Sequence, residues 1–275
     1  MTARLGFGVS GPHGARWFSE KTLTRLIAQA IEGGVAHFDT APFYGEAEVR
    51  LARALKAIGA CDVFISTKTG TRRNGGRVTK DFSPAAMRAD LDASRRRFGR
   101  DSIDLLFLHG PSAAEVEPAL SELAAMKAAG AVRMVGVCGE GPALDAALAG
   151  GADAVMGVFN AADRRHESLF RRARSAGVLV AGIAPLAQGA LADPAAPFRA
   201  SSLWRLARNR VRPAAPAAAL AQARRALGTA PSPSLAASAL AFVLQSGAVD
   251  LAFTTTTSPA HLAEALAAAA RRERP

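Results

Sequence analysis

Hydrophobic residues along this chain fall into two patterns that alternate from one end to the other. Short continuous runs rich in β-branched residues are typical of strands buried on both faces. Longer stretches carry apolar residues at the spacing of one helix face. The short runs predict strands over residues 5–8, 35–38, 63–66, 103–108, 132–137, 154–159, 178–183 and 251–254. The longer stretches predict helices near residues 20–32, 46–58, 84–98, 116–129, 142–149, 166–176, 234–245 and 259–270.

This alternation predicts an α/β protein with one parallel sheet. Eight strand–helix units favour a closed (β/α)8 barrel, the TIM barrel, over an open doubly wound sheet. A length of 275 residues is usual for one such barrel, so we expect a single domain over residues 1–275. The segment at about 187–233 breaks the rhythm and is rich in Pro, Ala and Arg. We expect an irregular excursion there, with a helix that lies over one end of the barrel.

The formal net charge of +11 raises the question of a nucleic-acid partner. Arginine supplies 29 of the 34 basic residues and alanine is abundant, which indicates a bias towards GC-rich codons. The basic residues are spread over the whole chain, and most fall on predicted helices as a solvated face. The charge therefore favours solubility and attraction of anions, and we expect no nucleic-acid partner.

Neither a membrane span nor an export signal is expected. The first residues lack the apolar core of a secretory signal. The most apolar long stretch, 235–253, is interrupted by polar residues and is typical of a helix followed by a strand. The two cysteines, Cys61 and Cys138, have no metal-ligand spacing, and Cys138 is expected to be a small core residue. We expect a cytoplasmic protein with reduced thiols and no metal site.

Residues 6–11 spell G-x-G-x-x-G directly after a predicted strand, as in dinucleotide-binding folds. That fingerprint requires a helix to begin at once, whereas Pro12, His13 and Gly14 continue the loop. Asp39 ends the next strand, but its neighbours give it another role. We therefore interpret these glycines as part of a loop and not as a dinucleotide fingerprint.

Polar side chains follow three successive predicted strands. Asp39 ends the second strand and leads into a loop with Tyr44, Lys68 ends the third, and His109 ends the fourth. The carboxyl ends of barrel strands open on one mouth, so these four side chains should converge there. Tyrosine occurs once in the chain and lysine only five times, yet both stand at these positions.

Together the four groups make a plausible acid catalyst. A phenol has a pKa near ~10, which is too high for easy proton exchange at neutral pH. A nearby Lys68 ammonium would lower the pKa of Tyr44, and Asp39 would hold that ammonium in place. His109 could orient or polarise a substrate oxygen. Each residue alone could be a strand-end cap, a loop aromatic or a surface lysine, but the set favours proton transfer to a carbonyl.

Several stretches resemble the aldo-keto reductase superfamily in motif, order and spacing. They are HFDTAPFYGEAE, ISTKTG, DLLFLHGPS, VRMVGVCG, AGIAPLAQGAL and TTTTSPAHLAEAL, which cover nearly the whole chain. DTAPFYG followed by DFS is most similar to the aldose-dehydrogenase-like branch. The resemblance implies an NAD(P)-dependent oxidoreductase that interconverts a small-molecule carbonyl, such as an aldehyde, ketone or sugar, and an alcohol. It also implies that Asp39, Tyr44, Lys68 and His109 form the catalytic tetrad, that the cofactor is NADP(H) or NAD(H), and that the protein is a monomer.

The resemblance also places the cofactor, but several of those positions differ from the family. The family usually has Ser-Asn where this chain has Cys138-Gly139, Gln where it has Met156, and a planar side chain where it has Ile183. The residues implied to line the cofactor are Gly8, Cys138, Gly139, Met156, Ile183, Pro185, Leu186, Gln188, Thr255, Thr256, Ser258, His261 and Glu264. Each lost hydrogen bond is worth ~1 kcal/mol and lost aromatic stacking about as much again, so several such losses could weaken cofactor binding by ~100-fold or more.

Two matters stay open on the sequence alone. One alternative is a barrel of this family with impaired nicotinamide binding, which would act as a binding or regulatory protein or as a non-redox enzyme. The other concerns the basic, glycine-rich segment 69–82, which holds Arg72, Arg73 and Arg77. It could clamp an anionic substrate, cover the cofactor phosphates, or be a solvated mobile loop.

Overall fold

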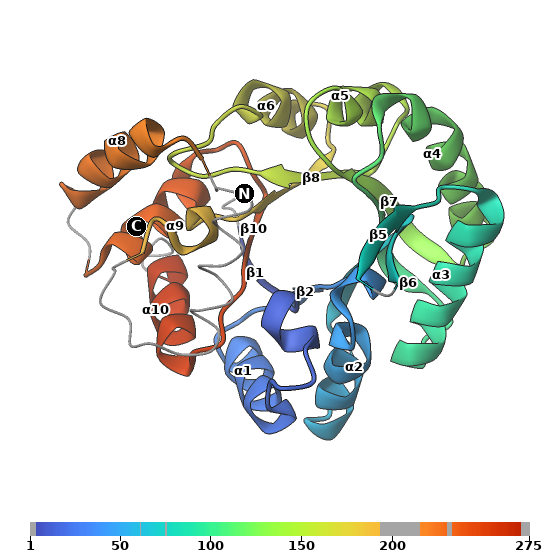
Figure 1. Cartoon of the computed structure of the whole chain (residues 1–275), viewed down its shortest axis with the longest axis horizontal. Coiled ribbons are helices and arrows are strands. Elements are labelled where there is room, and N and C mark those ends of the chain that lie inside the picture. Colours follow the sequence, from blue (N-terminus) through green and yellow to red (C-terminus); the bar gives the residue numbers. More distant parts are fainter. Residues whose placement is uncertain (1–3, 61, 75, 193–214, 230–232, 271–275) are drawn as a thin grey trace.

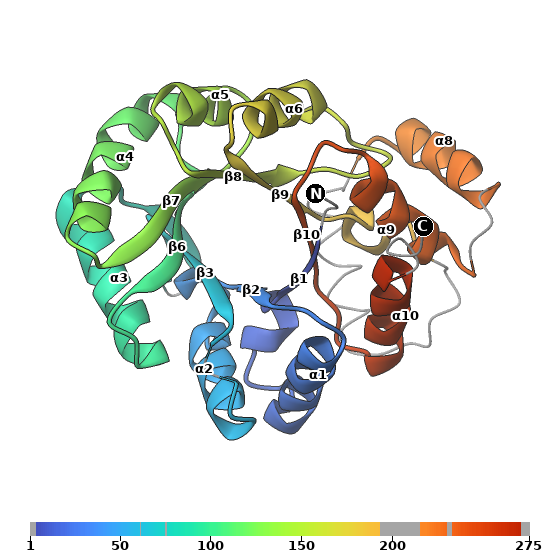
Figure 2. The ribbon, with the colours of Figure 1, turned by 180° about the vertical axis from the view of Figure 1, so that it is seen from behind.

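The computed structural model describes residues 4–60, 62–74, 76–192, 215–229 and 233–270. Its described strands form a closed parallel barrel in the order β1-β10-β9-β8-β7-β6-β3-β2, with helices packed around the outside (Figures 1 and 2). This confirms the predicted (β/α)8 barrel. The barrel strands are β1 (Arg4–Gly8), β2 (His37–Asp39), β3 (Phe64–Thr69), β6 (Ile103–His109), β7 (Val132–Cys138), β8 (Ala154–Val158), β9 (Leu179–Ile183) and β10 (Leu251–Thr254).

Helices follow the strands as the sequence pattern predicts. They are α1 (Glu20–Glu32), α2 (Ala47–Ala57), α3 (Pro84–Phe98), α4 (Ala113–Ala128), α5 (Pro142–Ala149), α6 (Glu167–Ser175), α8 (Ala217–Gly228), α9 (Leu235–Gln245) and α10 (Pro259–Ala270). Short 3-10 turns are η1 (Gly11–Gly14), η2 (Pro42–Tyr44) and η3 (Ala187–Gly189).

Helix α3 illustrates how local sequence sets these bounds. The Ser83 hydroxyl accepts a hydrogen bond from the Ala86 amide at 3.4 Å, and Pro84 occupies the first turn. Such an N-cap is worth about 1 kcal/mol. Gly99 ends the helix in a left-handed conformation with φ of +62°, which glycine adopts without steric cost. The helix therefore begins and ends at residues whose backbone preferences or side-chain hydrogen bonds stabilise a helix end.

Four strands, β2, β3, β6 and β7, end further along the chain than the predicted ranges. β3 runs to Thr69 and β6 to His109, because pairing continues through Lys68 with Phe107 and through His109 with Cys138. The expected start of β2 at residue 35 is wrong. The Val35 amide donates to the Ala30 carbonyl at 2.9 Å, so Val35 still belongs to the turn that ends α1.

The segment 69–82 is not the loop that its composition suggested. It forms an antiparallel hairpin of β4 (Thr71–Asn74) and β5 (Arg77–Lys80), which lies in front of the barrel in Figure 1. The Arg72 guanidinium fixes the hairpin to α3, because it donates to Asp90 at 2.9 Å and to the Ala86 carbonyl at 2.7 Å. The segment therefore has regular structure, and the residues of β5 are exposed to solvent.

Large side chains fill the inside of the barrel. One buried cluster gathers there from the inward faces of the strands: Leu105, Phe107, Cys138, Ala154, Met156, Ala181, Leu251 and Phe253. Two glycines make room for its rings. A Cβ at Gly136 would lie 2.8 Å from the Phe107 ring, and one at Gly6 would lie 2.5 Å from the Phe253 ring. Because the interior is filled, any substrate must bind at a mouth of the barrel.

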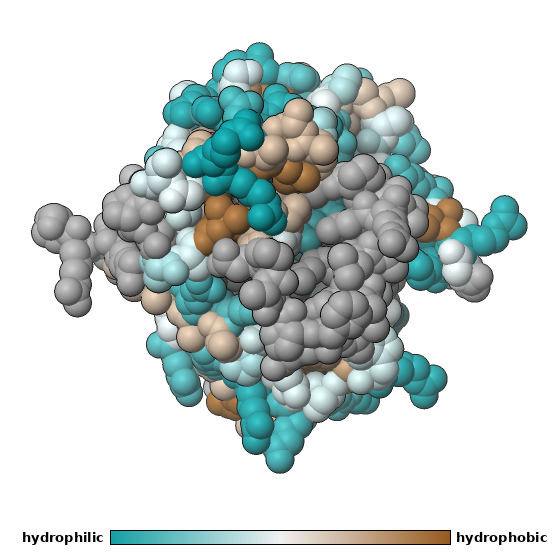
Figure 3. All heavy atoms as spheres, turned by 60° about the vertical axis from the view of Figure 1, so that its left-hand side comes forward, coloured by the Kyte–Doolittle hydropathy of each residue, from teal (hydrophilic) through white to brown (hydrophobic). Residues whose placement is uncertain are grey.

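The excursion expected at about 187–233 lies only partly within the described residues. Its described parts are η3, helix α8 and short flanking pieces, whereas 193–214 and 230–232 lie outside. Helix α8 clusters Ala223 and Leu227 with Leu191 and with Ala239 of α9. A helix is thus present as expected, but it lies on the outer side of the barrel next to α9 and not over a barrel end (Figures 1 and 2). Figure 3 shows this side of the molecule, where hydrophobic patches alternate with hydrophilic side chains. No helix in the described ranges is long and apolar enough to cross a membrane.

Candidate active site

Four polar side chains meet at the mouth where the carboxyl ends of the strands open. Asp39 ends β2, Lys68 lies near the end of β3, His109 ends β6, and Tyr44 ends the η2 turn that follows β2. β2 pairs with β3 and β3 with β6, so the three strands are neighbours in the barrel. The structure therefore brings together the four residues that the sequence singled out, called the tetrad below.

A buried ion pair forms the base of the tetrad. Lys68 Nζ lies 2.5 Å from Asp39 Oδ2 and donates to the Thr40 carbonyl at 2.9 Å, and both charged side chains are buried. Burial alone would lower the pKa of Lys68, but the negative charge of Asp39 raises it above its ordinary value of 10.5. Lys68 is therefore held as an ammonium with a fixed direction.

Tyr44 stands beside this ammonium and beside His109. Lys68 Nζ lies 5.3 Å from the centre of the Tyr44 ring, and the His109 ring centre lies 5.8 Å from it. The loop before α1 fixes the backbone of Tyr44. A Cβ at Gly14 would lie only 1.6 Å from the Tyr44 carbonyl oxygen, and the Gly14 carbonyl accepts from the Glu46 amide at 3.1 Å. Only glycine at position 14 permits this approach.

His109 is a neutral imidazole at neutral pH. Burial, together with the positive charges of Lys68 and Lys80, lowers its pKa to about 3. The Thr71 hydroxyl donates to the backbone carbonyl of His109 at 2.5 Å, which ties the hairpin to the end of β6. His109 Nδ1 is buried and has no hydrogen-bond partner among the described residues. A bound polar group would satisfy this nitrogen.

The hydrogen-bond network extends beyond Asp39 into the barrel. The Ser66 hydroxyl donates to Asp39 Oδ1 at 2.8 Å, and His37 Nε2 lies 3.1 Å from the same hydroxyl. The sequence analysis missed both residues. Period-two alternation could have found them, because Ser66 and His37 stand two positions before Lys68 and Asp39 and so share their faces of the strands.

The residues implied to line the cofactor continue around the mouth from the tetrad. They belong to β7, β8, β9, β10 and β1 and to the loops that follow some of these strands. Cys138 pairs with His109 and Gly8 with Asp39, whereas the loop after β9 lies across the barrel from β3.

Cys138 and Met156 are buried within the interior cluster. Burial raises the pKa of the Cys138 thiol to about 11, so it is a neutral core side chain. Glu264 accepts a short hydrogen bond from Ser234, whereas His261 is exposed.

The loop after β9 shows two signs of a ligand-binding segment. Three non-glycine residues, Ala184, Ala187 and Gln188, have positive φ between 45° and 57°. Such strain costs of order 1–3 kcal/mol for each residue and gathers at ligand clamps. Gln188 Oε1 is buried without a hydrogen-bond partner in the described part of the chain. The loop therefore fits a ligand that offers hydrogen-bond donors, as a dinucleotide does.

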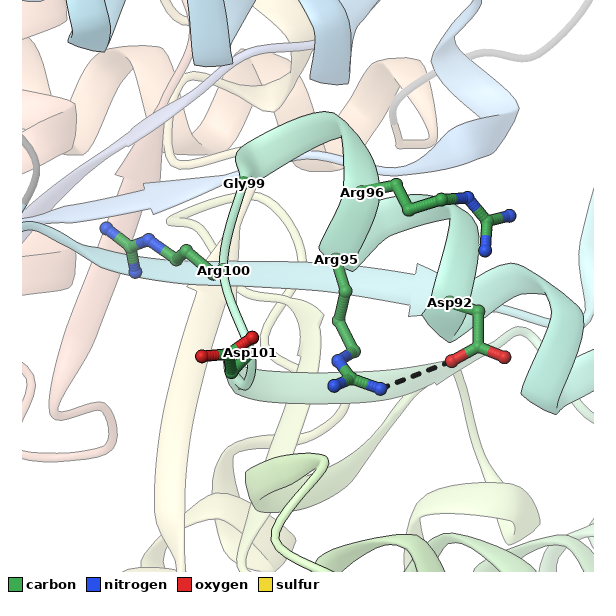
Figure 4. A pocket seen from close by; sticks show the side chains of 6 residues that line it. All are labelled: Asp92, Arg95, Arg96, Gly99, Arg100 and Asp101. Carbon is green, nitrogen blue, oxygen red and sulfur yellow. Dashed lines mark hydrogen bonds and ion pairs between the residues drawn. The ribbon is translucent and has the colours of Figure 1, made fainter.

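A hollow of about 320 Å³ lies at the opposite end of the barrel, between the end of α3 and the start of β6 (Figure 4). It contains several arginines, but Arg96 and Arg100 point in opposite directions in Figure 4. Arg100 donates to Asp104 at 2.8 Å, and Arg95 pairs with Asp92 at 3.3 Å. The arginines therefore do not converge on one anion, and we assign no site there. Within the described ranges, no three His, Cys, Asp or Glu side chains gather as metal ligands would.

The loop between β1 and α1 contains a second buried histidine, which gives a test by pH. His13 is fully buried, and its Nε2 lies 2.9 Å from the Thr256 carbonyl. Burial lowers its pKa from 6.5 to about 4, so the folded state favours the neutral ring. The contribution of His13 to the free energy of unfolding is complete above pH 6.5. It is lost as pH falls towards 4, because the unfolded chain binds the proton at a higher pH than the folded protein does.

We expect the free energy of unfolding to fall by roughly 1.4 kcal/mol per pH unit over this window because of His13. The measurement is urea denaturation at several pH values for the wild type and for His13→Gln, which keeps a donor but does not titrate. The wild type should show the steeper dependence. If the free energy of unfolding fell equally with pH in both proteins, the expectation would be contradicted.

The family comparison agrees with this geometry. The model of the aldo/keto reductase family matches residues 4–273. L-galactose dehydrogenase of Arabidopsis thaliana is 29% identical over 210 residues, which cover 70% of this chain and 64% of that protein. D-threo-aldose 1-dehydrogenase of a Pseudomonas species is 29% identical over 160 residues, which cover 48% of this chain and 49% of that protein. The chain thus spans less than two thirds of the length of either relative.

The fold is shared with solved structures. A glycerol dehydrogenase from Gluconobacter oxydans superimposes with a TM-score of 0.80 at 22% identity, over 96% of this chain and 86% of that one. The superposition supports the barrel assignment.

Proposed function

Because the chain belongs to the aldo/keto reductase family, we propose that it is an NAD(P)-dependent oxidoreductase that interconverts a carbonyl and an alcohol. Aldo/keto reductases use NAD(P)(H), so the cofactor class expected from the sequence is that of the family. The observation that supports this proposal most is the convergence of Asp39, Tyr44, Lys68 and His109 at one mouth of the barrel.

In this proposal Tyr44 is the general acid and base. It donates its phenolic proton to the carbonyl oxygen during reduction and takes it back from the alcohol during oxidation. The Lys68 ammonium, 5.3 Å from the phenol ring centre, stabilises the phenolate that forms. Asp39 holds the ammonium, and neutral His109 orients the carbonyl oxygen on the other side. Proton exchange with solvent then restores Tyr44.

The cofactor would lie along the β7–β10 and β1 side of the mouth. When bound in its reduced form it supplies a hydride to the carbonyl carbon. The strained loop with Gln188 would hold it on one side, and Ser258 before α10 would face its phosphate, where a helix N-terminus favours an anion. Gly8 permits the close approach of the Thr255 hydroxyl, because a Cβ at Gly8 would lie 2.5 Å from Thr255 Oγ1.

Titration of NADPH and of NADH tests the proposal, with cofactor fluorescence or a thermal shift as the readout. We expect saturable binding of at least one cofactor below millimolar concentration, and reduction of a simple aldehyde by the complex. Absence of binding at millimolar concentration of both would remove the redox function and favour the cofactor-poor alternative.

The finer assignment is an aldose-type dehydrogenase. Two relatives are named as dehydrogenases of sugars, L-galactose and a D-threo-aldose, which supports a polyhydroxy aldehyde as substrate. Comparison of kcat/KM for oxidation of several aldoses against simple alcohols would test it.

Gly139 offers a variant that should gain affinity for the cofactor. The family resemblance places an Asn amide where this chain has Gly139, next to the nicotinamide carboxamide. A Cβ at Gly139 would lie 3.6 Å or more from its nearest neighbours, which is ordinary van der Waals contact, so position 139 has room for a Cβ. Because an added hydrogen bond is worth ~1 kcal/mol, we expect Gly139→Asn to lower the Kd for NADPH by about fivefold.

Calorimetric titration measures this change, and Gly139→Ala is the matched control because it adds the Cβ without the amide. If both variants lowered the Kd for NADPH to the same extent, the Asn amide would not be the cause of the tighter binding.

A further inference from the structure

The β4–β5 hairpin turns one of its faces towards the tetrad. Residues directly opposite in an antiparallel pair share a face, and here Thr71 pairs with Lys80 and Arg73 with Val78. Thr71 binds the His109 carbonyl, so this face meets the end of β6. The other face carries Arg72 to Asp90 on α3. The inner face consists of Thr71, Arg73, Val78 and Lys80.

Two cations on the inner face border the tetrad. The Arg73 guanidinium lies 4.9 Å from the ring centre of Phe43, which precedes Tyr44 and lies 5.4 Å from the His109 ring centre. Lys80 Nζ donates to the carbonyl of Gly110, next to His109, at 2.5 Å. The two positive charges are thus anchored beside the residues proposed to meet the substrate.

Neither cation forms a salt bridge with an acidic side chain in the described part of the chain. Asp81 accepts from the Ser83 amide at 2.9 Å, and Glu115 accepts from Ser112 at 2.7 Å. The hydrogen bonds from Ser112 lower the pKa of Glu115, and the charge of Lys80 adds a smaller lowering, so Glu115 screens Lys80 in part without binding it. An unpaired cationic face at a mouth attracts and orients an anion.

The inner face lies across the mouth from the loop after β9, one of the segments that would hold the cofactor. In the closed barrel, β3 leads into the hairpin and stands opposite β9. The strained loop with Gln188 follows β9, so it lies on the side opposite the hairpin. The cations of the inner face are therefore placed for the substrate rather than for the cofactor phosphates. Val78, whose exposed fraction is 55%, lies on the same face and offers apolar contact to a carbon chain.

We propose that the inner face of the hairpin is an anion subsite and that the substrate is an aldehyde or ketone carrying a carboxylate or a phosphate. The inference rests on the proposed oxidoreductase function and adds its substrate class. The anionic group takes no part in the chemical step. The carbonyl carbon gains the hydride from NAD(P)H and the oxygen gains the Tyr44 proton, which gives the alcohol and NAD(P)+ while Arg73 and Lys80 hold the anion.

Two matched pairs of substrates test the proposal at saturating NADPH: 4-carboxybenzaldehyde against its methyl ester, and glyceraldehyde 3-phosphate against glyceraldehyde. We expect kcat/KM to favour the anionic member of at least one pair by about 10- to 100-fold, because hydrogen bonds to a charged group are the stronger kind. The pair that shows the preference identifies a carboxylate or a phosphate. The preference should fall as ionic strength rises.

Arg73→Gln and Lys80→Gln should each reduce this preference by about tenfold, mainly through KM. Arg77→Gln is the matched control, because it removes the same charge from the same hairpin but pairs with Asn74 on the outer face. It should change the preference by less than about twofold, as exposed charges away from a contact contribute little.

The outcomes separate this inference from the proposed function. Equal kcat/KM for both members of both pairs, with turnover intact, would overturn the anion subsite and leave the oxidoreductase standing. A loss of NADPH affinity in Arg73→Gln and Lys80→Gln with an unchanged preference would also overturn it and assign the cations to the cofactor. Calorimetric binding of 4-carboxybenzaldehyde that these variants weaken, without any turnover, would support the subsite and overturn the redox function.

Discussion

Replacement of Tyr44 by phenylalanine should lower kcat for aldehyde reduction by ~10²–10⁴-fold, the usual contribution of a positioned general acid. The ring and its contacts with Lys68 and His109 would stay, and only the proton donor would be lost. We therefore expect the Kd for NADPH to change by less than about twofold. Stopped-flow measurement of a single turnover separates the chemical step from cofactor binding.

The control for this variant is its own stability. Tyr44 packs at the edge of the core and is held by the backbone of Gly14. Thermal unfolding of Tyr44→Phe should thus match that of the wild type within a few degrees. If kcat and cofactor affinity fell together, Tyr44 would be a structural residue and the proton donor would have to be sought elsewhere.

The barrel could be predicted from the sequence because its strands are buried on both faces. Runs such as 178–183 are continuously apolar, so their position is visible without tertiary information. The hairpin could not be found this way. Its strands hold Arg72, Arg73 and Arg77 and bury little apolar surface, and a contact distant in sequence, from Arg72 to Asp90, fixes it.

The tetrad was predictable for a topological reason, and the network behind it was not. Strand ends in a parallel barrel open on the same side, so residues such as Asp39 and Lys68 converge whatever the details of packing. The link from Ser66 to Asp39 depends on which side chains face inward at adjacent positions. The strand ends predict the tetrad, whereas Ser66 and His37 follow only from the alternation of inward and outward side chains along the strands before those ends. The cofactor roles of Met156 and Glu264, taken from family resemblance, stay predictions.

Removal of one partner from the buried pair of Asp39 and Lys68 should cost more stability than any other single change among the tetrad contacts. Asp39→Leu leaves the Lys68 ammonium buried without its counter-charge, which costs about 3–5 kcal/mol in comparable cases. We expect the free energy of unfolding at pH 7 to fall by about that amount in urea denaturation. The double variant Asp39→Leu/Lys68→Met should recover most of the loss, because it removes both charges and fills the space with apolar atoms.

The dependence on pH should change sign between the two proteins. In the wild type the pKa of Lys68 is raised, so its contribution is complete below the unfolded value of 10.5 and is lost only as pH rises above that. In Asp39→Leu, burial without a partner lowers the Lys68 pKa, so stability should increase as pH rises from 7 towards 10. The double variant lacks this group and should show neither trend. If the free energy of unfolding of Asp39→Leu depended on pH as it does in the wild type, another carboxylate would have replaced Asp39 as the partner of Lys68.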